Sequence, residues 1–176
     1  QELRHEVAIV PQEGFLFTST LADNLRYGEP DADTAQVESA ASQARLADDI
    51  KGFPDGYETI VGERGITLSG GQRQRTALGR ALLVDAPVLV LDDALASVDN
   101  NTAAAILDSI RAQDGRTIVM ISHQLSAAAA CDRILVMDNG QIVQQGHHNQ
   151  LIQVAGVYRR LWEREQAVEG LDVMAS

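Results

Sequence analysis

The stretch Val88–Asp93, VLVLDD, decides the fold class. Four consecutive aliphatic residues that end in two acids are typical of a strand buried on both faces of a parallel sheet. Thr117–Ile121 (TIVMI) and residues 6–10 have the same character and predict two further strands. Helices are expected at residues 69–86 and 101–111. Because strands alternate with helices, the sequence predicts an α/β fold with a largely parallel sheet.

Two regions outside this sheet have patterns of their own. Between Gln12 and Ser69 a helical lobe is expected, because apolar residues recur at helical spacing from residue 21 to about residue 50. Near the other end, Asn139-Gly140 separates two apolar runs and predicts a β-hairpin. Two amphipathic helices are expected after it, with Tyr158 and Trp162, four residues apart, packed in a core.

Composition narrows the function classes. The chain has 176 residues and a net charge of −11. Such acidity argues against a nucleic-acid surface and against docking on an anionic membrane face. Carboxylates gather between Glu29 and Glu63, and we interpret them as a solvated face. No apolar run reaches the roughly 18 residues of a membrane span, and the single cysteine rules out an internal disulfide framework.

Polar residues follow the predicted strands directly. Asp92 and Asp93 end one strand, at the carboxyl edge where α/β proteins bind ligands. One acid there can hold Mg²⁺ through water and the other can orient an attacking water; the alternative is a pair of acids that only cap a helix. Ser122 and His123 end the neighbouring strand. A histidine beside a pair of acids favours a functional role over a structural one.

The sequence LSGGQRQR, Leu68–Arg75, has the features of an anion site. Ser69 can cap the helix with Gln72 as its capping-box partner, and the first amides of a helix attract negative charge. A plain capped helix is the alternative interpretation. Gly70 and Gly71 argue against it, since each glycine costs roughly 1 kcal/mol in a helix interior. The chain holds no G-x-x-x-x-G-K-[ST] loop to carry a phosphate of its own.

The motifs, taken in order, resemble the nucleotide-binding domain of an ATP-binding cassette (ABC) transporter. Gln12 is similar to the Q-loop glutamine and Leu68–Gln72 to the signature. Val88–Asp92 resembles the Walker B strand, Ala96–Asp99 the D-loop and His123 the switch histidine. TIVGERG (residues 59–65) and LFTSTLADNLRYG (residues 16–28) look like exporter sequences.

This resemblance implies a domain layout. The fold would be a P-loop NTPase (RecA-like) sheet with an inserted helical subdomain, without its N-terminal strands and P-loop. Its parts would be a Q-loop strand and loop (1–17), a helical subdomain with the signature (18–86), a Walker B, D-loop and switch core (87–146) and C-terminal helices (147–176). The P-loop and a membrane domain are expected upstream of Gln1. This chain alone should then be inactive and expose apolar surface where the missing part packs.

In that family two cassettes dimerise head to tail, and the signature of one closes over ATP held by the other. The cofactors implied are ATP and Mg²⁺, and the location is the cytoplasmic face of the cell membrane. The residues implied for nucleotide contact are Gln12, Ser69, Gly70, Gly71, Gln72, Asp92 and Asp99; those for the metal are Asp92 and Gln12; the catalytic ones are Asp93 and His123. The phosphate at the Ser69 helix would therefore belong to the partner.

One residue departs from the family pattern. Most active members carry Glu where this chain has Asp93, and the shorter carboxylate would lie about 1 Å further from the attacking water, a displacement that can cost on the order of 10²-fold in rate. The resemblance favours the weak half of a heterodimer over a homodimer with a slow site. A non-catalytic module that only lends its signature is the rival. A chromosome or repair ATPase is disfavoured by the charge, the TIVGERG loop and the lack of a coiled-coil insert.

Overall fold

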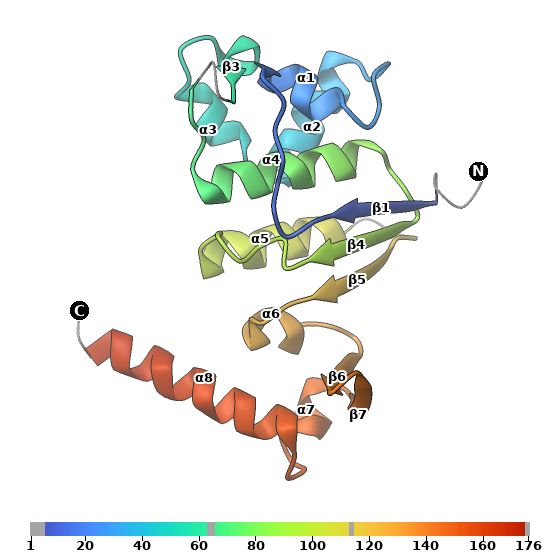
Figure 1. The fold of residues 1–176 in the computed structure, drawn as a ribbon, viewed down its shortest axis with the longest axis vertical. Helices are drawn as coiled ribbons and strands as arrows, with labels where there is room; N and C mark the ends of the chain where they lie inside the picture. The colour runs from blue at the N-terminus through green and yellow to red at the C-terminus, as the bar shows by residue number, and fades with distance from the viewer. Residues whose placement is uncertain (1–5, 63–65, 113–114, 175–176) are drawn as a thin grey trace. The chain divides into compact units, whose positions relative to one another are not determined.

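The structure is a computed structural model that describes residues 6–62, 66–112 and 115–174 (Figure 1). Contacts within the chain divide it into two units, Gln1–Ile121 and Ser122–Ser176. The first unit holds a parallel sheet and a helical lobe. The second holds an antiparallel hairpin and the last helices.

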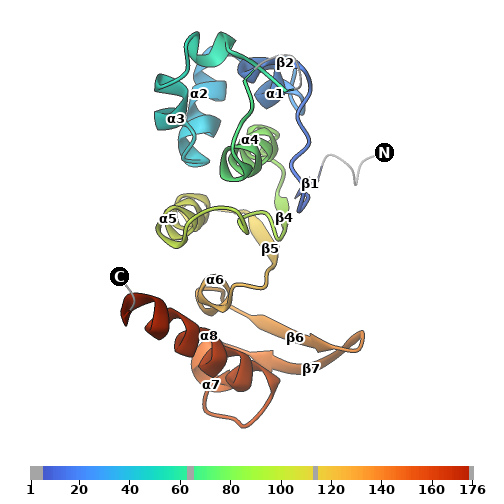
Figure 2. The ribbon, with the colours of Figure 1, turned by 60° about the vertical axis from the view of Figure 1, so that its left-hand side comes forward.

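A three-stranded parallel sheet organises the first unit. Its order is β1 (Val7–Val10), β4 (Val88–Asp92) and β5 (Thr117–Ile121), with Val7 opposite Val88 and Val88 opposite Thr117. Helices α4 (Gly70–Leu83) and α5 (Asn100–Arg111) lie on the same side of this sheet (Figure 2). The predicted α/β class with a parallel sheet is confirmed.

The strands are not buried on both faces, which corrects the sequence prediction for 117–121 and 88–91. Side chains of β5 alternate between exposed and partly buried, with Val119 46% and Ile121 53% exposed. Ile9 of β1, at 62%, is exposed as well. Leu89 and Leu91, by contrast, are both 1% exposed. Both faces of the sheet carry aliphatic side chains, as predicted. In the described residues, however, no other element covers one of these faces. The expected exposed apolar surface is thus confirmed.

The helical lobe breaks into shorter helices than the periodicity suggested. In place of one helical run from 21 to about 50, the chain forms α1 (Leu21–Arg26), α2 (Thr34–Gln43) and α3 (Ala47–Lys51). Asp33 caps α2, and Arg45, with φ 54°, ends it in the left-handed region. Two-residue strands β2 (Ser19–Thr20) and β3 (Ile60–Val61), with the 3₁₀ helix η2 (Gly56–Glu58), were not predicted.

The lobe has its own aliphatic core. Its buried members are Leu21, Leu25, Ala32, Val37, Ala41, Leu46, Ile50, Val61 and Leu68. Helix α4 contributes residues to the same lobe, with Leu78 fully buried, and it also contacts β1. The lobe is therefore joined to the sheet through α4, the helix that begins at the Ser69 motif.

The second unit confirms the hairpin prediction. Strands β6 (Ile134–Asp138) and β7 (Gln141–Gly146) pair antiparallel across Asn139 (φ 48°) and Gly140 (φ 76°). Two positive φ values are what a tight type I′ turn requires. Helices α6 (Leu125–Ala129), α7 (His148–Leu151) and α8 (Val157–Met174) complete the unit. Tyr158 is 1% exposed within its core, and Trp162 contacts His148 ring to ring at 4.5 Å.

Candidate functional site

Helix α4 begins with the capping box that the sequence predicts. The Ser69 hydroxyl oxygen accepts a hydrogen bond from the Gln72 amide at 3.2 Å, and the Gln72 side-chain oxygen accepts one from the Ser69 amide at 2.9 Å. The first intrahelical bond in this turn runs from the Arg73 amide to the Ser69 carbonyl at 2.9 Å. Helix geometry leaves the amides of Gly70 and Gly71 without an intrahelical acceptor.

An open cavity of about 290 Å³ lies at this helix start. Its lining comprises Ser69, Gly70, Gly71, Arg75, Ser97, Val98 and Asp99. The structure thus brings together four of the predicted nucleotide-contact residues, from two segments of the chain. Unpaired amides, the positive end of the α4 dipole and the Arg75 guanidinium make the cavity suited to an anion. Gln72 is not in the lining.

The two glycines have a packing reason besides ligand approach. A Cβ on Gly71 would lie 2.8 Å from the carbonyl oxygen of Ser97, which is too close without a shift of the backbone. A Cβ on Gly70 would meet the side chain of Ser97 at 3.3 Å. The glycines therefore let the Ser97–Asp99 loop approach the start of α4. That approach offsets their cost to the helix.

Gln12 and Asp93 meet beside the end of β4. The Gln12 side-chain nitrogen donates to the Asp93 carboxylate at 3.4 Å. Asp93 adopts φ 48°, and its amide donates to the Ile121 carbonyl at 2.8 Å. Aspartate tolerates this left-handed conformation better than most residues. Asp92 is exposed at the end of β4, as predicted for an acid at the carboxyl edge.

Sequence reasoning missed Gln74, which connects three of the motifs. Its side chain is buried, donating to the Gln12 carbonyl at 3.3 Å and accepting from the Ser97 amide at 2.8 Å. Gln74 thus ties helix α4 to both the Gln12 segment and the Ser97 loop. The available signal was position: Gln74 shares the inward face of α4 with Ala77, Leu78 and Ala81, where a polar residue needs a partner.

Asp99 lines the cavity and also caps α5. Its carboxylate accepts from the Thr102 amide at 2.9 Å. Hydrogen bonds from Thr102 hold the pKa of Asp99 below its ordinary value of 3.8. The carboxylate is therefore ionised at neutral pH, and it lines the same cavity as the start of α4.

His123 belongs to the second unit, where it is exposed in the segment between β5 and α6. Its meeting with Asp93 stays a prediction. The start of α6, just after this segment, is bonded to Glu165 of α8. The Glu165 carboxylate accepts from the Leu125 amide at 2.9 and 3.1 Å and from the Ser126 amide at 3.4 Å. These bonds fix the chain two residues beyond His123.

The exporter-like loop at residues 59–65 falls partly outside the described residues, which omit Glu63, Arg64 and Gly65. Thr59 is 3% exposed, and its hydroxyl accepts from the Asp55 amide at 3.2 Å. In residues 6–62, 66–112 and 115–174, no helix combines the length and apolar character that crossing a bilayer demands.

Known proteins resemble this chain over most of its length. The family model for "ABC transporter" matches residues 1–96, which is more than half of the chain. The chain belongs to the ABC transporter family. It is 45% identical over 170 residues to the multidrug resistance-like ATP-binding protein MdlA of Escherichia coli, covering 96% of this chain and 29% of that protein.

Two further comparisons point the same way. An ATP-dependent lipid A-core flippase of Chromohalobacter salexigens is 46% identical over 160 residues, which are 90% of this chain and 28% of that protein. The solved structure of a bacterial Atm1-family ABC exporter with ATP bound is similar with a TM-score of 0.89 and 43% identity, over 93% of this chain and 29% of that one. The chain thus spans less than a third of the length of these relatives.

The residues present fit the two groups that the family implies. The polar cavity at the α4 start suits a phosphate, for the reasons above. Asp92 offers an exposed carboxylate and Gln12 an amide, oxygen donors of the hard kind that Mg²⁺ prefers. Among the described residues no three acids, histidines or cysteines cluster into a metal cage. Mg²⁺ commonly binds through one or two carboxylates plus substrate phosphates, so an exposed carboxylate such as that of Asp92 is compatible with it.

Proposed function

We propose that this chain is part of the ATPase cassette of an ABC exporter and acts on ATP held by a partner cassette. The observation that carries the proposal is the cavity at the start of α4, where Ser69, Gly70, Gly71 and Asp99 come together. The 43–46% identity to MdlA, the lipid A-core flippase and the Atm1-family ABC exporter, over at least 90% of the chain, supports it. The cytoplasmic face of the cell membrane is the corresponding location.

Each residue has a proposed role. Ser69 and the amides of Gly70 and Gly71 bind the terminal phosphate of the partner's ATP. Asp92, with Gln12, holds Mg²⁺, which when bound neutralises phosphate charge. Asp93 orients the attacking water, and His123 contacts the terminal phosphate. The chain has no G-x-x-x-x-G-K-[ST] sequence, so alone it is expected to have no ATPase activity.

The transmembrane domain of the exporter is proposed to contact an exposed aromatic cluster of this chain. Phe15, Phe17 and Tyr27 are 67%, 37% and 60% exposed, and the Phe17 and Tyr27 rings stack at 4.5 Å. The Arg80 guanidinium lies 5.2 Å from the Tyr27 ring centre. Exposed aromatic residues are enriched at protein interfaces. In the intact transporter, Tyr27→Ser should lower transport more than ATP hydrolysis; an equal loss of both would contradict a coupling contact.

Substitutions at Ser69 test the main proposal in the intact transporter. Asp caps a helix about as well as Ser, so Ser69→Asp keeps the cap but adds a negative charge where the phosphate is expected. We expect ATPase activity at the partner's site to fall at least about tenfold, as for loss of a charge-assisted bond. Ser69→Asn, a neutral cap of similar quality, is the control and should lose less. Full activity in Ser69→Asp would refute the proposal.

We further propose that this cassette is the weak half of a heterodimer, because Asp93 stands where the family pattern has Glu. The rival candidate is a module that lends its signature without catalysing. If the two cassettes are an asymmetric pair, Asp93→Ala should change total turnover little, and a large loss would rule out the heterodimer. Asp93→Glu should raise turnover if the shorter acid alone limits the weak site. An unchanged rate would place the limit elsewhere in that site.

A further inference from the structure

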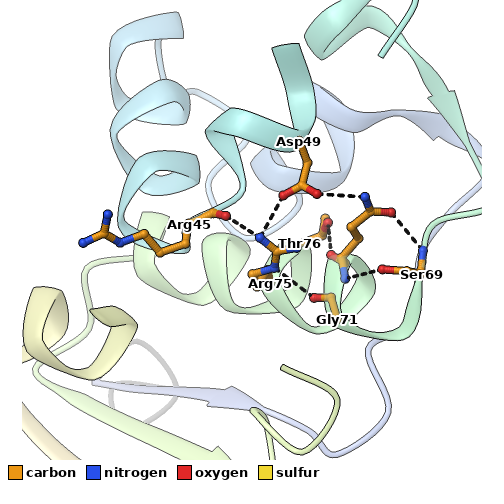
Figure 3. Close-up of polar contacts among 7 residues, drawn as sticks. Arg45, Asp49, Ser69, Gly71, Arg75 and Thr76 are labelled. Carbon is orange, nitrogen blue, oxygen red and sulfur yellow. Dashed lines mark hydrogen bonds and ion pairs between the residues drawn. The ribbon is translucent and has the colours of Figure 1, made fainter. Parts of the chain in front are cut away.

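Asp49, a residue of α3 without a place in the motifs above, contacts two residues of α4. Its two oxygens accept from the Gln72 side-chain nitrogen at 2.9 Å and from the Arg75 guanidinium at 2.8 Å (Figure 3). Residues three apart lie on the same face of a helix, so one carboxylate holds both. The side chains of Asp49 and Arg75 are only 22% and 15% exposed.

Through Gln72 this contact reaches the Ser69 cap. The Gln72 amide has two different ends, and its oxygen already accepts from the Ser69 amide at 2.9 Å. A carboxylate is an acceptor only, so Asp49 requires the nitrogen end of Gln72 to face it. The direction of the Gln72 amide, and with it the capping box, is therefore fixed from α3.

Through Arg75 the contact reaches the cavity itself. Arg75 lines the cavity with Ser69 and Asp99. Its guanidinium donates to Asp49, to the carbonyl of Gly71 at 3.4 Å and to the carbonyl of Arg45. The cation beside the expected phosphate is thus held in place by one carboxylate and two backbone carbonyls.

The way in which α2 ends positions two of the acceptors of Arg75, the Arg45 carbonyl and the Asp49 carboxylate. The Leu46 amide bonds to the Ala41 carbonyl at 2.8 Å and the Arg45 amide to the Ser42 carbonyl at 3.0 Å. This is a Schellman ending, in which the residue at Arg45, φ 54°, is ordinarily glycine. The tight ending turns the chain directly into α3. It sets both the Arg45 carbonyl and the Asp49 side chain against the first two turns of α4.

We propose that Asp49 is a positioning residue of the phosphate-contact site, acting through Gln72 and Arg75. The proposal rests on the proposed function, because it assumes that the α4 start contacts ATP. Asp49 touches no nucleotide itself. It links the helical lobe to the site, so a shift of α3 relative to α4 changes how Ser69 and Arg75 meet the phosphate.

The test compares Asp49→Asn with Asp48→Asn in the intact transporter. Both acids lie in the first turn of α3, so both variants lose the same charge at the same helix end. Asp48 is 92% exposed and pairs with Lys51 at 2.6 Å. In Asp49, one oxygen accepts from Gln72 and the other from Arg75. An asparagine at 49 replaces one of these oxygens with an NH₂ donor, so one of the two donors then faces another donor.

We expect Asp49→Asn to lower kcat/KM for ATP by about tenfold or more, the usual effect of losing a hydrogen bond to a charged group. Affinity for ADP, which lacks the terminal phosphate, should not change. Asp48→Asn should behave as the unsubstituted protein, and Asp49→Glu should recover part of the activity. Equal kinetics in the two Asn variants, or a parallel loss of ADP affinity, would overturn the proposal and leave a structural ion pair.

The single variant Gln72→Met covers the case in which Asp49→Asn folds poorly, because it removes the same link from the side of α4. Where both single variants fold, the double variant tests the route: if Asp49 acts through Gln72, the two losses should not add. Fully additive losses would overturn that route. The Ser69→Asp variant separates the positioning role of Asp49 from the proposed function. If Ser69→Asp is inactive while Asp49→Asn matches Asp48→Asn, only the role of Asp49 fails. If Ser69→Asp is active, the proposed function fails.

Discussion

Gln74 offers a quantitative test of how the motifs are joined. Gln74→Met keeps the length, the unbranched shape and nearly the helix propensity of the side chain, and it removes both polar ends. The bond from the Ser97 amide is 2.8 Å and the bond to the Gln12 carbonyl is 3.3 Å. The first is therefore expected to contribute more.

The expected loss follows from these bonds. A protein hydrogen bond contributes about 0.5–1.5 kcal/mol net, so two give about 1–3 kcal/mol. Ser97 and Gln12 are exposed residues, and water can replace part of the bonding after the substitution. We therefore expect a decrease of about 1–2 kcal/mol in the free energy of unfolding. Urea unfolding curves of the variant and the unsubstituted chain measure it.

Gln43→Met is the matched control. Gln43 is also on a helix and is half-buried, and its side-chain nitrogen donates to the Ser39 hydroxyl of the same helix at 3.3 Å. Because this bond is exposed to solvent, we expect a smaller loss of stability than in Gln74→Met. Amide hydrogen exchange should also be faster at Ser97 in Gln74→Met and unchanged in Gln43→Met. Equal stability of the two variants, with unchanged exchange at Ser97, would refute the view that Gln74 joins the segments.

Three further predictions address single contacts. Gly71→Ala should lower the free energy of unfolding by about 1–3 kcal/mol, because the new methyl group overpacks against the Ser97 carbonyl. Gly70→Ala, whose methyl group would meet only the Ser97 side chain, should be close to neutral. Equal losses of the two variants in urea unfolding would contradict the close approach of the Ser97 carbonyl to Gly71. The pKa of Asp99 should lie below its ordinary value of 3.8. The stability that its cap gives α5 is then fully present above pH 3.8 and is lost as the pH falls through the lowered pKa. Asp99→Asn keeps a capping residue but should remove this pH dependence from the urea midpoints. Glu165→Gln should speed amide exchange at Leu125 and Ser126, because one acceptor oxygen replaces two. Glu163→Gln, which changes an exposed ion pair with Arg159, should leave that exchange unchanged. Equal exchange in the two variants would contradict the view that Glu165 holds the start of α6.

Local patterns predicted local structure well. The Ser69 and Gln72 capping box and the Asn139-Gly140 turn form as the sequence indicates, because each depends on residues within four positions of one another. The alternation of strands and helices likewise predicted the parallel sheet. The family resemblance gave Ser69 and Asp99 as nucleotide contacts, but their position in one cavity was not predicted, since the two segments are distant in the chain.

Contacts between distant segments were the part that the sequence could not supply. Gln74 bonds across 62 positions to Gln12, and Arg75 across 26 to Asp49. No periodicity marks such pairs, since glutamine and arginine on a helix usually face solvent. The burial of β5 was mispredicted for a related reason: Val119 and Ile121 are aliphatic, but burial depends on which elements cover the sheet.

The central claim is that the Ser69 helix contacts ATP held by a partner. The most direct measurement is photocrosslinking in the intact transporter with an ATP analogue that carries its reactive group on the terminal phosphate. We predict a crosslink in the peptide Leu68–Arg75 of this chain, lost when the P-loop lysine of the partner cassette is substituted. Crosslinking elsewhere, or crosslinking here that persists without the partner's lysine, would contradict the account.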